Sequence, residues 1–380
     1  MATALAGVVT MFAATASADS SITVDSVLQR WPWNNKVDIT YTVSGGQNVA
    51  AGSFARIAFA AAIGGRTYTL DGNEVGADAS DGTHTVTWTL PSGLKANDCS
   101  MTAQLIAADI PSGNEYMIVD LVTGAVAYEG LYVDQNGSNA RYNTDVYKKD
   151  KLLLRKVPAG SYYAVAKTWT TIRDYYAGVF PVTSYQYTKL CGGSATDLKP
   201  KASISWDNLR VAGTPPESPI PTVSSSTGTF LQRLNYLTGN KLGFDLPTEV
   251  MFEISERAGA TTTYFWGDTM DTDYIVCSDN SGSTKAIVGS RKPNNWGLYD
   301  TAGNVWELCL DGMGEGGTSG TDPFSPRLVW SGYKAHRIRG GGSYGDASSG
   351  EAFQASYAGQ QQTPGASAPW TGFRVFRIVK

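Results

Sequence analysis

Apolar and polar residues alternate along the first third of the chain. Within residues 36–43, Val37, Ile39, Tyr41 and Val43 fall on one face of an extended strand, because successive side chains of a strand point to opposite faces. Four further segments have the same strand-like character: 54–61, 83–90, 101–107 and 116–122. Short strands separated by glycine-containing turns are typical of β-sandwiches. The pattern therefore predicts a small β-sandwich of immunoglobulin-like type over residues 19–135.

The alternation stops in a polar segment, residues 136–149, which we interpret as a linker. Residues 150–380 then form a second region, in which two helical patterns are embedded in irregular chain rich in Gly, Trp and Tyr. We therefore predict an α+β protein with two domains, in which an all-β domain precedes a mixed domain.

The two helices of the second domain are predicted from apolar residues at helical spacing. The first carries Phe230, Leu231, Leu234 and Leu237, with Ser226 or Thr227 as its N-cap and Gly239 after its end. The second runs from about Thr248, its expected N-cap, to Ala258. On this helix Glu249 and Glu253 are either an acid/base pair or part of a structural face on which Glu253 pairs with Arg257, four residues on.

The amino terminus has the pattern of an export signal. Residues 4–16 are apolar and Ala16-Ser17-Ala18 follows them, which is typical of a signal peptide covering residues 1–18. A buried helix or strand is the alternative. Because no later run of about 20 apolar residues exists, we expect no transmembrane segment. We predict a secreted, cell-surface or periplasmic protein.

Composition and charge exclude several classes of function. The formal net charge is −4 and the pI is near 5.3, so we expect no nucleic-acid partner. Only two histidines are present, His84 and His336, so a three-histidine metal site cannot be built within one chain. The four cysteines, Cys99, Cys191, Cys277 and Cys309, lack metal-ligand spacing. In an exported chain they form one or two disulfides or remain buried thiols.

Five blocks in a fixed order give the second domain a family resemblance. They are FLQRLNYLTGNKLGFDLPTEVMFEISERAG (230–259), YFWGD (264–268), NNWGLYDTAGNVWELCLD (294–311), RIRGGGSY (337–344) and TGFRVFR (371–377). In this order they resemble the formylglycine-generating enzymes, also called sulfatase-modifying factors. The resemblance covers about residues 150–380 and implies a variant of the C-type lectin fold. The predicted sandwich lies outside it.

The resemblance implies a chemistry for which this chain lacks residues. Members of the family oxidise a sulfatase cysteine to formylglycine with copper held by two cysteines, which follow the GGSY block five residues apart. The matching positions here are Asp346 and Glu351. Hard carboxylates are poor ligands for Cu(I). A related branch of the fold uses iron on three histidines, and His336 is the single histidine of this domain. We therefore expect neither copper nor iron.

The resemblance also implies a structural calcium ion in the GNVWE loop. Its matching ligands are the carboxylates of Asp300 and Glu307 and the backbone carbonyls of Gly303 and Val305. The alternative is a loop that these residues close without metal. We expect Trp306 and Trp296 to pack beneath the loop, and Arg374 of the GFR block to form an ion pair inside the domain.

Residues 342–371 have the composition of a binding surface. In this fold the segment lines the exposed ligand face, and retroelement-diversified receptor proteins carry their variable residues here. The candidate ligand-binding residues are Tyr344, Asp346, Glu351, Phe353, Gln354, Tyr357, Gln361 and Trp370. Aromatic and amide side chains of this kind are common in binding loops. A plain solvent-exposed loop is the alternative.

Two functions remain after these exclusions. The first is a secreted, non-catalytic scaffold that binds an unknown protein or carbohydrate through residues 342–371. The second is a metal-dependent oxidoreductase of the formylglycine-generating type with a non-standard centre, which rests on the family resemblance alone.

Overall fold

The chain divides into two compact units in the computed structural model. One comprises residues 1–111 and 132–144, and the other residues 112–131 and 145–380. The structure describes residues 20–378 except for internal segments, which are 31–34, 46–52, 76, 78, 80, 92–93, 95–98, 110–112, 132–139, 165–167, 215–217, 313–335, 340 and 358–360. The predicted signal peptide, residues 1–18, therefore lies outside the described residues.

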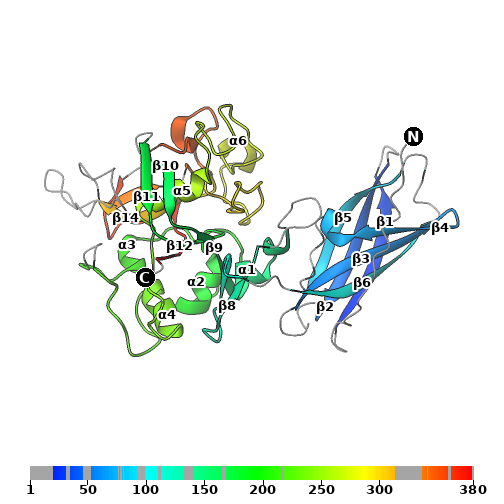
Figure 1. The fold of residues 1–380 in the computed structure, drawn as a ribbon, viewed down its shortest axis with the longest axis horizontal. Helices are drawn as coiled ribbons and strands as arrows, with labels where there is room; N and C mark the ends of the chain where they lie inside the picture. The colour runs from blue at the N-terminus through cyan, green and yellow to red at the C-terminus, as the bar shows by residue number, and fades with distance from the viewer. Residues whose placement is uncertain are drawn as a thin grey trace. The chain divides into compact units, whose positions relative to one another are not determined.

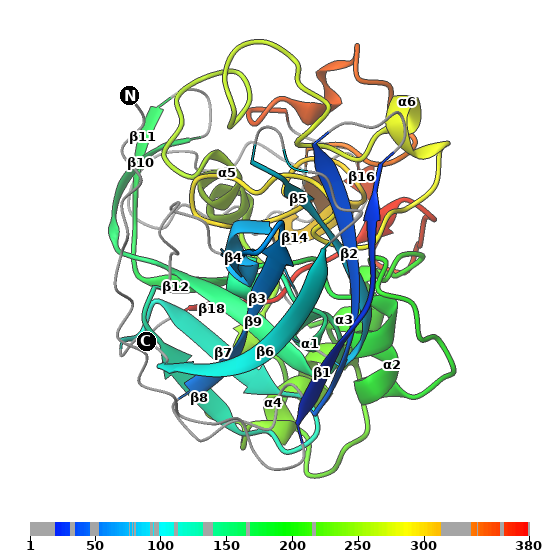
Figure 2. The same ribbon diagram turned by 90° about the vertical axis from the view of Figure 1, so that its right-hand side faces the viewer.

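The first unit contains two antiparallel sheets of three strands each (Figures 1 and 2). In one sheet β2 (Lys36–Ser44) pairs with β1 (Ser21–Gln29) and β5 (Gly82–Thr89). In the other, β3 (Ser53–Ile63) pairs with β4 (Arg66–Asp71) and β6 (Ser100–Asp109). A short 3₁₀ turn, η1 (Gly72–Val75), follows β4.

The inner faces of these two sheets share one apolar core, as the alternation predicted. Val37, Ile39, Tyr41 and Val43 of β2 are all buried. The ring of Tyr41 packs edge-on against Phe59 of the opposite sheet, with ring centres 5.4 Å apart. Two sheets that bury one face each against a common core form a β-sandwich. Strands β1 and β4 were not among the predicted segments.

The predicted strand at 116–122 belongs to the other unit, which corrects the predicted domain limit at residue 135. Strand β7 (Tyr116–Asp120) pairs with β8 (Val126–Glu129) and with β9 (Lys151–Val157) in the sheet of the second unit. Tyr116, Met117, Ile118 and Val119 are all buried. A strand that is apolar on both faces suits a sheet covered on both sides, whereas the strands of the sandwich alternate.

The second unit is built on a six-stranded sheet of order β13-β18-β12-β9-β7-β8. Its remaining strands are β12 (Tyr175–Gly178), β13 (Phe244–Asp245) and β18 (Phe376–Ile378). A four-stranded sheet has the order β16-β15-β14-β17, with β14 (Trp306–Gly312), β15 (His336–Arg339), β16 (Gln361–Gln362) and β17 (Thr371–Gly372). A hairpin of β10 (Gly160–Ala164) and β11 (Thr168–Ile172) lies beside α5 (Glu249–Arg257), as Figure 1 shows.

Short helices join these strands. Besides α5 they are α1 (Val146–Lys149), α2 (Ser184–Cys191), α3 (Trp206–Leu209), α4 (Phe230–Leu237) and α6 (Ser278–Ser281), with the 3₁₀ turn η4 (Glu351–Phe353). The 3₁₀ turn η3 (Ala140–Tyr142) belongs to the first unit. The mixture of helices and strands confirms the α+β class. No helix in the described part of the chain is long and apolar enough to cross a membrane.

The two predicted helices are present, with one correction at an N-cap. Helix α4 begins after Thr229, and neither Ser226 nor Thr227 caps it. The Thr229 hydroxyl accepts from the Gln232 amide, while the Gln232 side chain accepts from the Thr229 amide. This reciprocal capping box satisfies two backbone donors, which explains why the helix begins there. Helix α5 begins after Thr248, as predicted, and its Glu253–Arg257 pair is buried.

Candidate functional site

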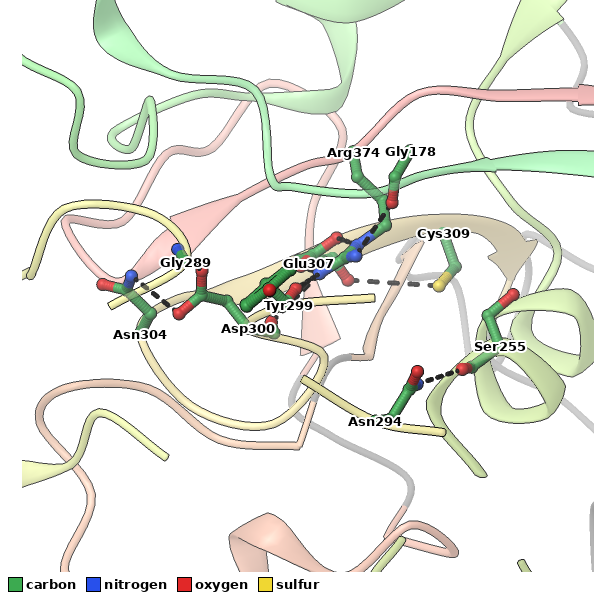
Figure 3. Close-up of polar contacts among 10 residues, drawn as sticks. All are labelled: Gly178, Ser255, Gly289, Asn294, Tyr299, Asp300, Asn304, Glu307, Cys309 and Arg374. Carbon is green, nitrogen blue, oxygen red and sulfur yellow. Dashed lines mark hydrogen bonds and ion pairs between the residues drawn. The ribbon is translucent and has the colours of Figure 1, made fainter. Parts of the chain in front are cut away.

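A buried ion pair joins two of the sequence blocks at the centre of the second unit. Arg374, next to β18, contacts Glu307 of β14 through two bonds, Nη2 to Oε1 at 2.6 Å and Nε to Oε2 at 2.7 Å (Figure 3). Both side chains are fully buried. Two parallel bonds fix the planar guanidinium against the carboxylate. The predicted ion pair of Arg374 is therefore confirmed, and its partner is one of the predicted calcium ligands.

The remaining donors of Arg374 hold backbone carbonyls from two other segments. Nη1 donates to the Gly178 carbonyl at the end of β12, and Nη2 donates to the carbonyls of Tyr299 and Asp300, each at 3.0 Å. One side chain thus connects β12, the loop at 299–300 and β14. Buried carbonyls of irregular chain need such donors, because no strand partner supplies them.

Asp300 is buried beside this pair and organises the GNVWE loop through hydrogen bonds. Its Oδ2 accepts from the Gly289 amide at 2.7 Å and its Oδ1 accepts from Asn304 Nδ2 at 3.3 Å. Burial raises the pKa of Asp300 and of Glu307 above their ordinary values, although Arg374 opposes the rise at both. Two buried carboxylates therefore lie near a single guanidinium.

The shape of this loop has a steric cause at Gly303. Its φ is +83°, and a Cβ there would lie 2.7 Å from the backbone nitrogen and oxygen of Val276. Asn304 extends this contact, since its amide donates to the Val276 carbonyl and its carbonyl accepts from the Tyr344 amide. The loop thereby supports the start of the predicted ligand-binding segment.

The four predicted calcium ligands are all buried, and the oxygens of Asp300, Gly303 and Glu307 are engaged within the protein. Both carboxylate oxygens of Glu307 contact Arg374, and the carbonyl of Gly303 accepts from the Val305 amide at 2.9 Å. A calcium ion at Glu307 would also meet the positive charge of Arg374. In this conformation the residues do not fit a calcium ion, because Arg374 supplies the cation. The resemblance implies calcium here, whereas these contacts favour the alternative, a loop that closes without metal.

A melting experiment with a chelator tests calcium binding. We expect EDTA to leave the melting temperature of the full chain unchanged, because Arg374 already compensates Glu307. An ion that binds only the folded state would stabilise it, so removal of the ion would lower the melting temperature. A fall with EDTA that excess calcium reverses would show that the ion binds despite Arg374.

Removal of Glu307 should destabilise the second unit strongly. We expect Glu307→Ala to lower the free energy of unfolding by about 3–5 kcal/mol, because Arg374 would keep a buried charge without its carboxylate. Glu351→Ala is the control, since Glu351 is exposed and its replacement should cost less than about 0.5 kcal/mol. Urea unfolding of both variants measures the difference, and equal losses would contradict the central role of the pair.

Phe353 is not part of the ligand-binding face, which corrects the prediction. Its side chain is fully buried in an apolar cluster with Tyr264, Phe265, Ile275, Cys277 and Ala302. A Cβ at Gly342 would lie 2.6 Å from the Phe353 ring, so the GGSY block packs directly on it. Turn η4 directs this ring inward. Composition alone could not show that direction.

Other predicted face residues are wholly or partly accessible. Glu351 and Trp370 are exposed, and Tyr344, Asp346 and Gln354 are half-buried. The Tyr344 hydroxyl donates to the Pro369 carbonyl at 3.2 Å, which joins the two ends of the segment.

The last two predicted face residues are Tyr357 and Gln361. Tyr357 is half-buried, with its ring centre 6.0 Å from that of Trp306. The strand that contains Gln361 pairs with β15, but the Gln361 side chain is outside the described part.

The side chain of Asp346 accepts hydrogen bonds from within residues 342–371. Its Oδ2 accepts from the amide and the hydroxyl of Ser343, each at 2.8 Å. The amide of Ser278 in α6 donates to the Asp346 carbonyl. Asp279 of α6 adds a second attachment, since its Oδ2 accepts from the Ser348 amide at 2.8 Å. Sequence reasoning missed Asp279 and Ser348, because only tertiary structure brings α6 to this turn.

Among the described side chains, the candidate redox residues are not grouped into a centre. All four cysteines are free thiols, of which Cys277 and Cys309 are buried and Cys99 and Cys191 are half-buried. His84 lies in the first unit against Tyr41, and the His336 side chain is not described. Within the described residues, no group of three or more His, Cys, Asp or Glu side chains is placed to hold a metal ion.

The predicted packing tryptophans differ in their surroundings. Trp306 is buried in the main apolar core, as predicted. Trp296 is half-buried and packs edge-on against Tyr162 of the β10–β11 hairpin, with ring centres 5.5 Å apart.

The sequence from residue 137 to 379 matches the sulfatase-modifying factor enzyme 1-like domain. Among curated proteins, a formylglycine-generating enzyme of Streptomyces coelicolor is 33% identical over 119 residues, which is 27% of this chain and 36% of that protein. A formylglycine-generating enzyme of Thermomonospora curvata is 31% identical over 159 residues, 35% of this chain and 48% of that protein. The matches thus span less than half the length of these two relatives.

Two solved structures are similar to this chain. Treponema denticola variable protein 1 is 21% identical, covers 60% of this chain and 96% of its own, and gives a TM-score of 0.47. PvdO from Pseudomonas aeruginosa is 16% identical, covers 60% of this chain and 94% of its own, and also gives 0.47.

Proposed function

Because the chain belongs to the sulfatase-modifying factor enzyme 1-like domain family, we propose that it uses the family scaffold as a secreted, non-catalytic binding protein. The ligand is a protein or carbohydrate, and the binding face lies within residues 342–371. One observation carries this proposal: Asp346 and Glu351 stand at the two positions where the resemblance expects the copper-binding cysteines.

The surroundings of these two carboxylates do not favour copper chemistry. Asp346 accepts two hydrogen bonds from Ser343, and Glu351 is exposed. Carboxylates favour hard cations, whereas Cu(I) favours thiolates. Cys277 and Cys309 are fully buried, so their thiols are not available to a sulfatase peptide at the surface.

The same segment has properties that suit binding. Trp370 is 41% exposed, and Tyr344 and Gln354 are partly accessible. Rigid aromatic rings give a large contact area at a low entropy cost, and amides adapt their hydrogen bonds to different ligands. The bonds from Asp346 and Asp279 hold the turn at 343–348 in one shape, which reduces the cost of ordering on binding.

An oxidation assay separates this proposal from the alternative, a metal-dependent oxidoreductase of the formylglycine-generating type. We expect no aldehyde when the full chain is incubated with Cu(I), oxygen and a cysteine-containing sulfatase peptide, because the thiolate pair is missing. An authentic formylglycine-generating enzyme under the same conditions is the positive control. Mass spectrometry of the peptide detects the product, and turnover by this chain would establish the oxidoreductase.

The position of the binding face is tested with one exposed side chain. On arrays of glycans and purified surface proteins, we expect Trp370→Ala to reduce binding to any captured ligand at least about tenfold, since exposed aromatic residues dominate many interfaces. Ile287→Ala is the matched control, because Ile287 is 49% exposed and lies outside residues 342–371. Equal effects of the two substitutions would place the ligand elsewhere.

A further inference from the structure

The second unit contains a cavity of about 360 Å³ whose lining includes no residue of the proposed binding face. Helix α4, strands β13 and β18, and the extended segment at 218–222 surround it. Ile220, Leu310 and Ile378 give it apolar walls, and Asp245 and Lys241 are its charged residues. Cavities of roughly 300–1,000 Å³ with apolar walls and a few polar groups are typical of small-molecule sites.

One carboxylate oxygen of Asp245 has two protein partners, and the other faces no hydrogen-bond donor among the described residues. Oδ1 forms an ion pair with Arg210 Nε at 3.0 Å and accepts from the Leu246 amide at 2.8 Å. Within the described part of the chain, Oδ2 accepts no hydrogen bond. The Asp245 side chain keeps 23% of its surface exposed, although Arg210 is fully buried. A carboxylate oxygen at the cavity wall is therefore available to a ligand.

Other contacts hold Arg210, the partner of Asp245, in place. Arg210 Nη2 donates to the Ser218 carbonyl at 2.6 Å, and the guanidinium lies over the Trp206 ring, 4.9 Å from its centre. Burial raises the pKa of Asp245 to about 6 even though Arg210 opposes the rise. The ionised carboxylate is thus incompletely compensated, and a further positive charge would stabilise it.

Two other cations are near this carboxylate in the fold. Lys241 lines the cavity and is exposed to solvent. Arg377 of β18 donates to the Leu242 carbonyl and lies over the Tyr176 ring, so its contacts are outside the cavity.

We propose that this cavity binds a small primary amine with an apolar body. The ammonium group donates to Asp245, and the apolar body lies against Ile220, Leu310 and Ile378. An anion would be repelled by Asp245, and a neutral apolar molecule would remove water from Oδ2 without supplying a donor, which is unfavourable. This site is separate from the proposed ligand face, so its test does not depend on that proposal.

Three matched probes test the charge requirement on the full chain. Isothermal titration at about pH 7.5 compares phenethylamine, phenethyl alcohol and hydrocinnamate, which share an aromatic body and differ in charge. We expect saturable binding of the amine, at least about tenfold tighter than of the alcohol, and none of the carboxylate. Equal affinity for amine and alcohol, or no amine binding, would overturn the proposal.

Two substitutions locate the amine. Asp245→Asn should weaken amine binding at least about tenfold, whereas Asp207→Asn, a half-buried acid on α3 outside the cavity, should leave it unchanged. Because Asp245→Asn also leaves Arg210 without its carboxylate, Ile220→Trp provides a second test that keeps the pair and fills the cavity. It should abolish amine binding while the melting temperature stays close to wild type. Full binding by folded Ile220→Trp protein would refute the site.

The pH dependence of the amine affinity tests whether the Asp245 carboxylate contacts the amine. If Asp245 had only a structural role, its ionisation would not change this affinity. The carboxylate is ionised above its pKa of about 6 and protonated below it. The amine stays protonated throughout. Amine affinity should therefore fall between about pH 7.5 and pH 5 in the wild type, and the Asp245→Asn variant should lose this fall. A flat wild-type profile would contradict the role of Asp245.

Discussion

The contact between Arg374 and Glu307 is the constraint on which the second unit depends. Glu307 lies on β14 in the four-stranded sheet, while Arg374 precedes β18 in the six-stranded sheet. Their two hydrogen bonds therefore join both sheets of the unit. Since both charges are buried, each would be costly alone, and together they fix the relative position of the elements that carry them. The carbonyls of Gly178, Tyr299 and Asp300 complete the same arrangement.

This constraint explains how so much irregular chain keeps a defined surface. Arg374 donates to the Asp300 carbonyl at the start of the loop, and Asn304 Nδ2 donates to Asp300 Oδ1 within it. The Asn304 carbonyl then accepts from the Tyr344 amide. Further out, Asp346 and Asp279 hold the turn at 343–348. The exposed side chains of Glu351 and Trp370 take no part in these bonds. A surface supported in this way can change its exposed residues without loss of the fold, which is a useful property for a binding protein.

Patterns that depend on near neighbours in the chain were predicted well. The buried face of β2, helix α5 with its Thr248 N-cap, and the Glu253–Arg257 pair all follow from local periodicity and spacing. The misplaced cap of α4 had a local signal too, because Thr229 and Gln232 have the spacing of a capping box. Strand β7 was assigned to the wrong domain, although its run of four buried apolar residues indicated a sheet covered on both faces.

The sequence by itself determined the family and the α+β class, because these depend on residue identity and order. It also has Asp346 and Glu351 at the positions where the resemblance expects copper-binding cysteines. Only the tertiary structure decided which side chains meet. In the structure Phe353 is buried in an apolar cluster, and Glu307 pairs with Arg374 where the resemblance implied calcium. Asp245 lines a cavity. Burial and partners are set by residues distant in the chain, such as Glu307 and Arg374, 67 positions apart. The charge, accessibility and chemistry of each group follow from those partners.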